Sequence, residues 1–146
     1  METSVKDAYL KAFKGSFTST MRWRDLDVFW QTLRVQADDG WFIYAVGQQP
    51  PQSAVSKQQL LSFIDEIDAL LHKEHEEDYC GIVYVDNQQA PEYIKIFDPN
   101  NLGVTCGFSE KPPLPGWILS RIPPIELEDA LYPPKNRQRW WQKVFS

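Results

Sequence analysis

The sequence predicts an α+β fold: a single domain over residues 1–146, with a mostly antiparallel four- to five-stranded sheet packed against helices, one of them a crossover helix at about 57–73. Two observations predict this fold. The chain has a common length for one domain, with no internal repeat and no linker long enough to separate two domains. Segments with apolar residues at helical spacing precede and separate short apolar runs that are bounded by turn-forming residues.

Two helices are expected near the N-terminus, over residues 4–14 and 24–36. The first begins near Ser4, a good N-cap residue, and ends at Gly15. The second carries apolar residues at helical spacing: Trp23, Leu26, Trp30 and Leu33. The apolar run that follows predicts a strand over 41–46 that is buried on both faces.

The helix expected over about 57–73 has the clearest start signal in the chain. Ser56 and Gln59 have the spacing of a capping box, and Val55 and Leu60 have the spacing of a hydrophobic staple. A wide apolar stripe follows. The helix separates two expected strands, as a crossover helix does.

Four more strands are expected after this helix, over about 81–85, 93–97, 104–108 and 117–122. The linkers between the first three are rich in Asp, Asn, Pro and Gly, so these three strands are expected to form an antiparallel meander. Paired prolines then interrupt the chain. A last helix, basic and aromatic, is expected at about 136–145.

Charge and composition exclude several classes of function. The net charge of −5 argues against nucleic acid as a partner, because phosphate contacts need an excess of Lys and Arg. No apolar run reaches the length of a transmembrane helix, and the N-terminus lacks the layout of a secretory signal. The two cysteines do not make a disulfide framework. We therefore expect a cytoplasmic protein, and no motif in it implies a cofactor.

The C-terminal segment is the first candidate site. Aromatic residues make up 14% of the chain, and large rings dominate recognition surfaces as well as cores. The candidate partner-binding residues combine charge and rings: Arg137, Arg139, Trp140, Trp141 and Phe145. Such a helix can bind a protein partner, or it can dock on its own domain. We favour docking on the domain, and we expect no contact with a membrane surface.

A polar cleft is the second candidate. Lys95 and Arg121 lie in otherwise apolar strands, and Cys80 stands at the start of another. If the face of the strand that carries Arg121 is buried, its guanidinium needs a carboxylate partner or lines a polar cleft. These residues, near the helix end with His72 and His75, are the candidate cleft.

His72 and His75 are also weak candidates for metal ligands, with the thiol of Cys80 close to them in the sequence. Their spacing places them on neighbouring helical positions, with several carboxylates nearby in the sequence. The spacing matches no established metal-binding pattern. A solvated helix end explains the same residues, and we favour that explanation.

Two functions follow from these features. The first is a non-catalytic protein-binding or assembly module that uses an aromatic surface, with a protein partner or self-association. Its support is the aromatic excess and the absence of any catalytic motif, so we assign no catalytic residue. The alternative is a small enzyme or ligand-binding domain with a cleft near Arg121, Lys95 and the His72/His75 helix end.

Overall fold

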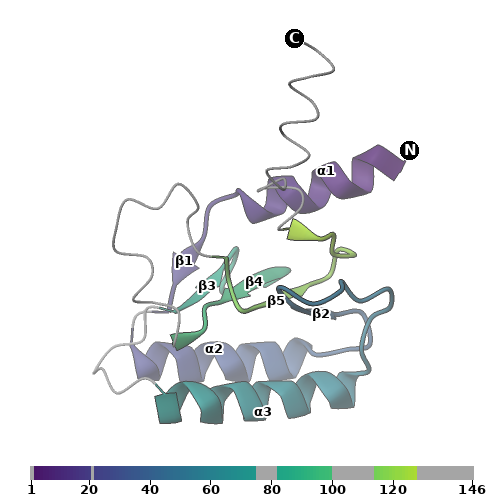
Figure 1. Ribbon diagram of the computed structural model, residues 1–146. Helices are drawn as coiled ribbons and strands as arrows, with labels where there is room; N and C mark the ends of the chain where they lie inside the picture. Colours follow the sequence, from purple (N-terminus) through teal and green to yellow (C-terminus); the bar gives the residue numbers. More distant parts are fainter. Residues whose placement is uncertain (1, 21, 75–81, 100–113, 128–146) are drawn as a thin grey trace.

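The computed structural model describes residues 2–20, 22–74, 82–99 and 114–127. These residues form three layers (Figure 1). Helix α1 (Glu2–Phe13) covers one face of a sheet. Helices α2 (Trp23–Gln36) and α3 (Lys57–Glu74) lie side by side on the other face. The two outer layers give the sheet two separate cores.

The sheet has five strands in the order β1-β3-β4-β5-β2, and every neighbouring pair is antiparallel. The strands are β1 (Thr18–Ser19), β2 (Phe42–Ala45), β3 (Val83–Val85), β4 (Tyr93–Ile96) and β5 (Trp117–Ser120). The expected α+β class, with an antiparallel sheet packed against helices, is confirmed. The expected crossover connection of α3 depends on residues 75–81, which lie outside the described residues, and it stays a prediction.

Strand order differs from the expected meander in one respect. One edge of β4 pairs with β3 and the other pairs with β5, so β5 is the third strand of the antiparallel run. The sequence predicts 104–108 in that place, which β5 takes instead, and residues 104–108 lie outside the described part of the chain. The two-residue strand β1 was not expected at all, because two residues carry no measurable periodicity.

Strand alternation divides the side chains between the two cores. On β4, Ile94 and Ile96 face α2 and α3, whereas Tyr93 and Lys95 face the side of α1. The larger core lies between the sheet and α2/α3, and its biggest members are Phe29, Trp30, Trp41, Leu60, Ile64 and Leu71. The smaller core lies between the sheet and α1, and it contains Tyr9, Tyr44, Tyr93, Ile118 and Leu127.

The position of β2 explains why its sequence is apolar throughout. It lies at an edge of the sheet, which is not the central position that a strand buried on both faces suggests. Nevertheless Ile43 packs against the larger core and Tyr44 is buried in the smaller one, since helices cover both faces. Most of its side chains are accordingly half-buried.

The start of α3 forms as its sequence predicts. The backbone N–H of Gln59 donates to Ser56 Oγ at 3.1 Å, and the backbone N–H of Ser56 donates to Gln59 Oε1 at 2.9 Å. This reciprocal pair satisfies two amide groups near the helix start that have no partner within the helix. Asp39 adds a third acceptor for the N–H of Lys57.

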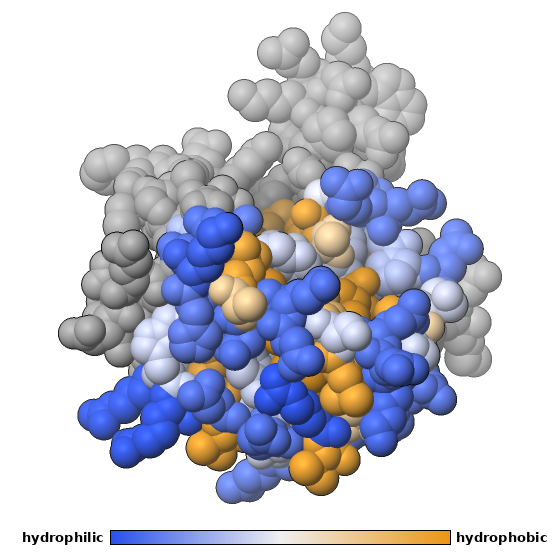
Figure 2. Space-filling model, turned by 90° about the horizontal axis from the view of Figure 1, so that it is seen from below, coloured by the Kyte–Doolittle hydropathy of each residue, from blue (hydrophilic) through white to orange (hydrophobic). Residues whose placement is uncertain are grey.

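The outer surface of α2 and α3 is mainly hydrophilic, with hydrophobic side chains in separate patches (Figure 2). Within the described residues, the exposed large hydrophobic side chains are Val28 and Val35, both on α2. None of the described helices combines the length and the hydropathy needed to cross a membrane.

Candidate functional site

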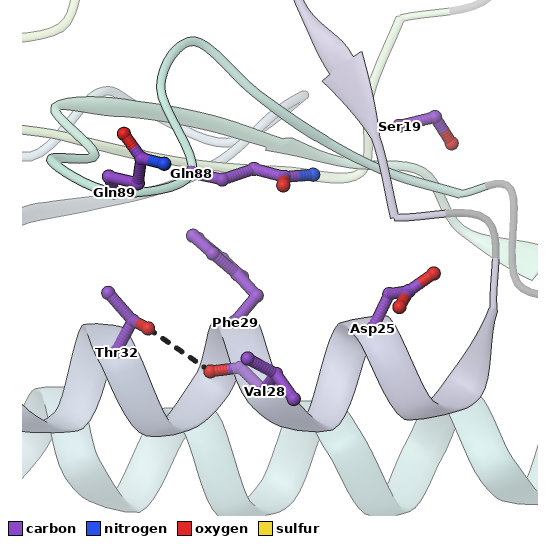
Figure 3. A pocket seen from close by; sticks show the side chains of 7 residues that line it. All are labelled: Ser19, Asp25, Val28, Phe29, Thr32, Gln88 and Gln89. Atoms are coloured by element: carbon purple, nitrogen blue, oxygen red, sulfur yellow. Dashed lines mark hydrogen bonds between the residues drawn. The ribbon is translucent and has the colours of Figure 1, made fainter.

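A groove lies between α2, β1 and the turn that joins β3 to β4 (Figure 3). We call it the α2 groove; it has a volume of about 420 Å³ and is lined by Ser19, Asp25, Val28, Phe29, Thr32, Gln88 and Gln89. The turn is held in place because Asp86 Oδ1 accepts hydrogen bonds from the backbone N–H groups of Asn87, Glu92 and Tyr93. Gln36 Nε2 also donates to the carbonyl of Gln89 at 2.8 Å.

The chemistry available in the α2 groove is limited. Among its described lining residues, Asp25 is the one ionisable side chain, and the Thr32 hydroxyl already donates to the carbonyl of Val28 at 3.2 Å. Figure 3 shows Phe29 pointing from α2 toward the turn, with Gln88 extended above it. The groove therefore offers a contact surface that is part polar and part apolar, and its described lining carries no paired acid and base.

The face of the sheet toward α1 contains a more unusual group, the side chain of Lys95 on β4. Its ammonium lies 4.0 Å from the ring centres of both Phe13 and Phe17, where the negative ring faces attract a cation. It also donates a hydrogen bond to the carbonyl oxygen of Phe13, the last residue of α1. Cations favour this end of a helix, where the last carbonyls lack partners.

Lys95 differs from the other half-buried basic side chains that the structure describes. Among the described side chains, three basic ones are half-buried: Arg34, Lys95 and Arg121. Arg34 pairs with Asp65 at 2.9 Å, and Arg121 pairs with Asp38 at 3.1 Å. Within the described residues no carboxylate pairs with Lys95, so its charge is balanced only by a carbonyl and two rings.

A cavity of about 200 Å³ adjoins this ammonium. We call it the Lys95 pocket, and it is lined by Phe17, Tyr84, Lys95 and Phe97. Tyr84 is the direct cross-strand partner of Lys95, and its ring meets that of Phe97 edge to face with centres 5.5 Å apart. The pocket is thus a small space lined by three aromatic rings, with the ammonium of Lys95 at its side.

Burial lowers the pKa of Lys95 to about 8, because removing the ammonium from water disfavours its charged form. The rings and the carbonyl of Phe13 do not restore the ordinary value. Lys95 is therefore a cation in neutral solution that would gain from an anionic neighbour.

The structure separates the residues of the predicted polar cleft. Arg121 follows β5 on the side of α2, where its guanidinium lies 4.8 Å from the ring centre of Trp41 and bonds Asp38. It also donates to the carbonyl of Gln36 at 3.4 Å. Lys95 faces the opposite side of the sheet, and Cys80 lies outside the described residues. Lys95 and Arg121 therefore do not share a cleft. Arg121 instead bonds the segment that connects α2 to β2, through Asp38 and the carbonyl of Gln36.

His72 does meet carboxylates, although not through His75, which lies outside the described residues. Asp68, one turn earlier on α3, has Oδ1 3.4 Å from His72 Nε2. Asp27 on α2 joins them, so that one ligand atom from each of the three residues lies within 4.8 Å of the others. Sequence reasoning missed both acids. The contact of Asp27 depends on how α2 and α3 pack, whereas the spacing of Asp68 and His72 on one helix was a local signal that could have been used.

The aromatic surface expected at the C-terminus stays a prediction. Its candidate residues, Arg137, Arg139, Trp140, Trp141 and Phe145, all lie outside the described residues, as does the expected helix 136–145. Every aromatic side chain that the structure does describe is buried or half-buried. In that part of the chain the aromatic excess goes into the two cores and the Lys95 pocket.

The other members of the Lys95 pocket were also missed by sequence reasoning. Phe17 lies just outside any periodic segment, and Tyr84 was assigned only to a strand. One signal was available: in the strand expected at 93–97, Lys95 shares its face with Tyr93. A lysine on an inward face of an apolar strand marks a site that needs a specific explanation.

Comparison with known protein families, with curated proteins and with solved structures finds no match in any of the three. The function must therefore be argued from the site itself.

Proposed function

We propose that this protein is a small-ligand-binding domain that holds an anionic molecule with an apolar ring in the Lys95 pocket. The observation that carries the proposal is an ammonium that pairs with no carboxylate of the described residues and that borders a cavity. Of the three half-buried basic side chains described, Lys95 alone has no carboxylate among the described residues, and a cavity opens beside it.

The chemistry of the pocket selects a carboxylate. An ammonium has three N–H donors, and one of them is engaged by the carbonyl of Phe13. A ligand carboxylate can accept from the others, and hydrogen bonds to charged groups contribute roughly 1.5–3 kcal/mol each. The rings of Phe17, Tyr84 and Phe97 supply the apolar part of the contact, where ring pairs add roughly 0.5–1.5 kcal/mol.

The size of the pocket limits the ligand. Sites for drug-sized molecules have volumes of about 300–1,000 Å³, and the Lys95 pocket has about 200 Å³. It therefore suits a single ring with one carboxylate, either as a whole molecule or as the end of a larger one. Benzoate is a suitable probe of this class.

The test is a titration of the whole protein with benzoate at pH 7, in which NMR signals of the protein are recorded at each benzoate concentration. We expect saturable shifts of Lys95, Tyr84 and Phe97 signals, and at least tenfold weaker binding of neutral benzamide. Lys95→Met should lower benzoate affinity at least tenfold, and Lys95→Arg should retain part of it. Lys57→Met is the matched control, since Lys57 is exposed, and it should bind benzoate as the wild type does.

Two results would contradict the proposal. One is equal affinity for benzoate and benzamide, which would show that the charge of Lys95 plays no part. The other is unchanged benzoate binding by a folded Lys95→Met variant, which would place the ligand elsewhere.

A second candidate function is a protein-binding module that uses the outer face of α2. Val28 and Val35 are two helical turns apart on the same side of α2, with 63% and 83% of their surfaces exposed. Val28 also lines the α2 groove. Two exposed valines on one side of a helix can contribute to self-association, so Val35→Glu should lower the mass that light scattering gives at high concentration, whereas Ala69→Glu on α3 should not. A monomer at every concentration removes this candidate.

A further inference from the structure

Two acids and a histidine meet where α2 and α3 run side by side, on the face of the sheet opposite the Lys95 pocket. Asp68 and His72 occupy one face of α3, one turn apart, and Asp27 reaches them from α2. The position of the group is fixed by the packing of the two helices, which bury Leu26 and Ile67 between them and the sheet. We propose that Asp27, Asp68 and His72 form a binding site for a divalent transition-metal ion, with Zn²⁺ as the best match.

Two of the three side chains are held by neighbours outside the group. The indole N–H of Trp30 donates to Asp68 Oδ1 at 3.1 Å, the kind of outer contact that orients metal-binding carboxylates. The ring of Trp23 stacks on the imidazole of His72, with ring centres 4.1 Å apart and planes 23° from parallel. Both contacts limit the rotation of a ligand side chain before any ion binds.

The charges of the group favour a cation. Elsewhere among the described residues, Asp38 and Asp65 each form an ion pair with an arginine. Asp27 and Asp68 have no Lys or Arg partner there, and the one basic group near Asp68 is the imidazole of His72. Two carboxylates beside an imidazole are consequently left with negative charge that a divalent ion would neutralise.

The donor set and its spacing point to the class of ion. Carboxylate and imidazole together suit Zn²⁺ and its first-row neighbours better than Ca²⁺, which takes oxygen ligands only. Ligands around a tetrahedral Zn²⁺ lie about 3.3 Å apart, given bonds of about 2.0–2.1 Å. The present atoms lie within 4.8 Å of one another, and Asp27 is exposed and can rotate inward. Three protein ligands leave further positions open to water.

The test is binding of Zn²⁺ to the whole protein after treatment with a chelator, measured by competition with a chromophoric chelator. We expect one bound ion and at least a tenfold loss of affinity in Asp27→Asn and in His72→Gln. Asp25→Asn is the matched control, because it removes an exposed acid of the same helix outside the group. Co²⁺ should bind with visible absorption bands that Asp27→Asn removes.

Two outcomes overturn the inference. If the protein binds no Zn²⁺ at micromolar concentrations, the group is only an Asp–His pair on one helix with an acid nearby. If Zn²⁺ binds equally to the wild type and to a folded Asp27→Asn variant, the ion is held by other residues.

Discussion

The ammonium of Lys95 donates a hydrogen bond to the carbonyl oxygen of Phe13 and so joins the sheet to the last residue of a helix 82 positions away in the chain. The same ammonium contacts the rings of Phe13 and Phe17 and borders a small cavity. It therefore has a structural role, as an anchor for α1, beside the ligand-binding role that we propose for it.

Lys95 should make stability depend on pH in the alkaline range. Burial lowers its pKa in the folded protein to about 8, below the ordinary 10.5 of the unfolded chain. Between these values the unfolded state binds more protons, so the free energy of unfolding rises with pH by at most about 1.4 kcal/mol per unit. Because the side chain is half-buried and partly solvated, we expect a fraction of that slope.

The measurement is chemical unfolding of the wild type and of Lys95→Met from pH 7 to 10. The difference between the two unfolding free energies should change in favour of the wild type above pH 8. A difference that stays constant over this range would show that Lys95 is not desolvated.

Asp38 should make stability depend on pH in the acidic range. The N–H of Gly40 lowers the pKa of Asp38 below its usual value, and Arg121 lowers it further. The stability from this group is fully present above the ordinary carboxyl pKa and is lost as the pH falls through the lowered one. Asp38→Asn should therefore be less stable than the wild type at pH 7, with the gap closing below about pH 4. Chemical unfolding of the wild type and of Asp38→Asn between pH 7 and pH 3 measures this gap, and a gap that stays constant over the range would contradict the prediction.

The capping box should contribute measurably to stability. Ser56→Ala removes the acceptor for the N–H of Gln59 and should cost about 1 kcal/mol. Gln59→Ala should cost less, and the double variant should cost less than the sum, since the two bonds form one motif. Ser62→Ala, on an exposed position of the same helix, should have little effect. Thermal unfolding of the four variants measures these differences.

Gly47 should resist substitution for a backbone reason. Its φ is +100°, and a Cβ placed there would meet no atom within 4 Å. Gly47→Ala should thus cost roughly 1–2 kcal/mol through backbone strain alone. Gly47→Asn should cost less, because Asn tolerates positive φ better than Ala. A larger loss in Gly47→Asn than in Gly47→Ala would point to a side-chain clash instead.

Features of the fold that depend on contacts between residues close in the sequence could be predicted, and features that depend on distant residues could not. The start of α3 was predictable because Ser56 and Gln59 exchange hydrogen bonds within one helical turn. The pairing of β4 with β5 was not, since no local pattern decides which strand takes the second edge of β4. The short strand β1 was missed because its two residues form a strand only by pairing with β3.

The sites follow the same rule. Lys95 was identified as a candidate because it stands out in an apolar strand, whereas Phe13 and Phe17 reach it only through the packing of α1. His72 was identified for its chemistry, but its expected partner was His75 rather than Asp68 and Asp27. Residue type thus indicated where chemistry is possible. Tertiary packing brought Phe13, Phe17 and Asp27 to these residues, whereas Asp68 lies one turn from His72 on the same helix.

The pKa of Lys95, followed by NMR of its ε-methylene group with and without benzoate, tests the central claim most directly. A value of about 8 in the free protein should rise by about one unit or more when benzoate is bound, because a carboxylate beside the ammonium favours its charged form. By linkage, benzoate should bind more weakly as the pH rises above 8. An ordinary pKa in the free protein, or one that saturating benzoate leaves unchanged, would contradict the account.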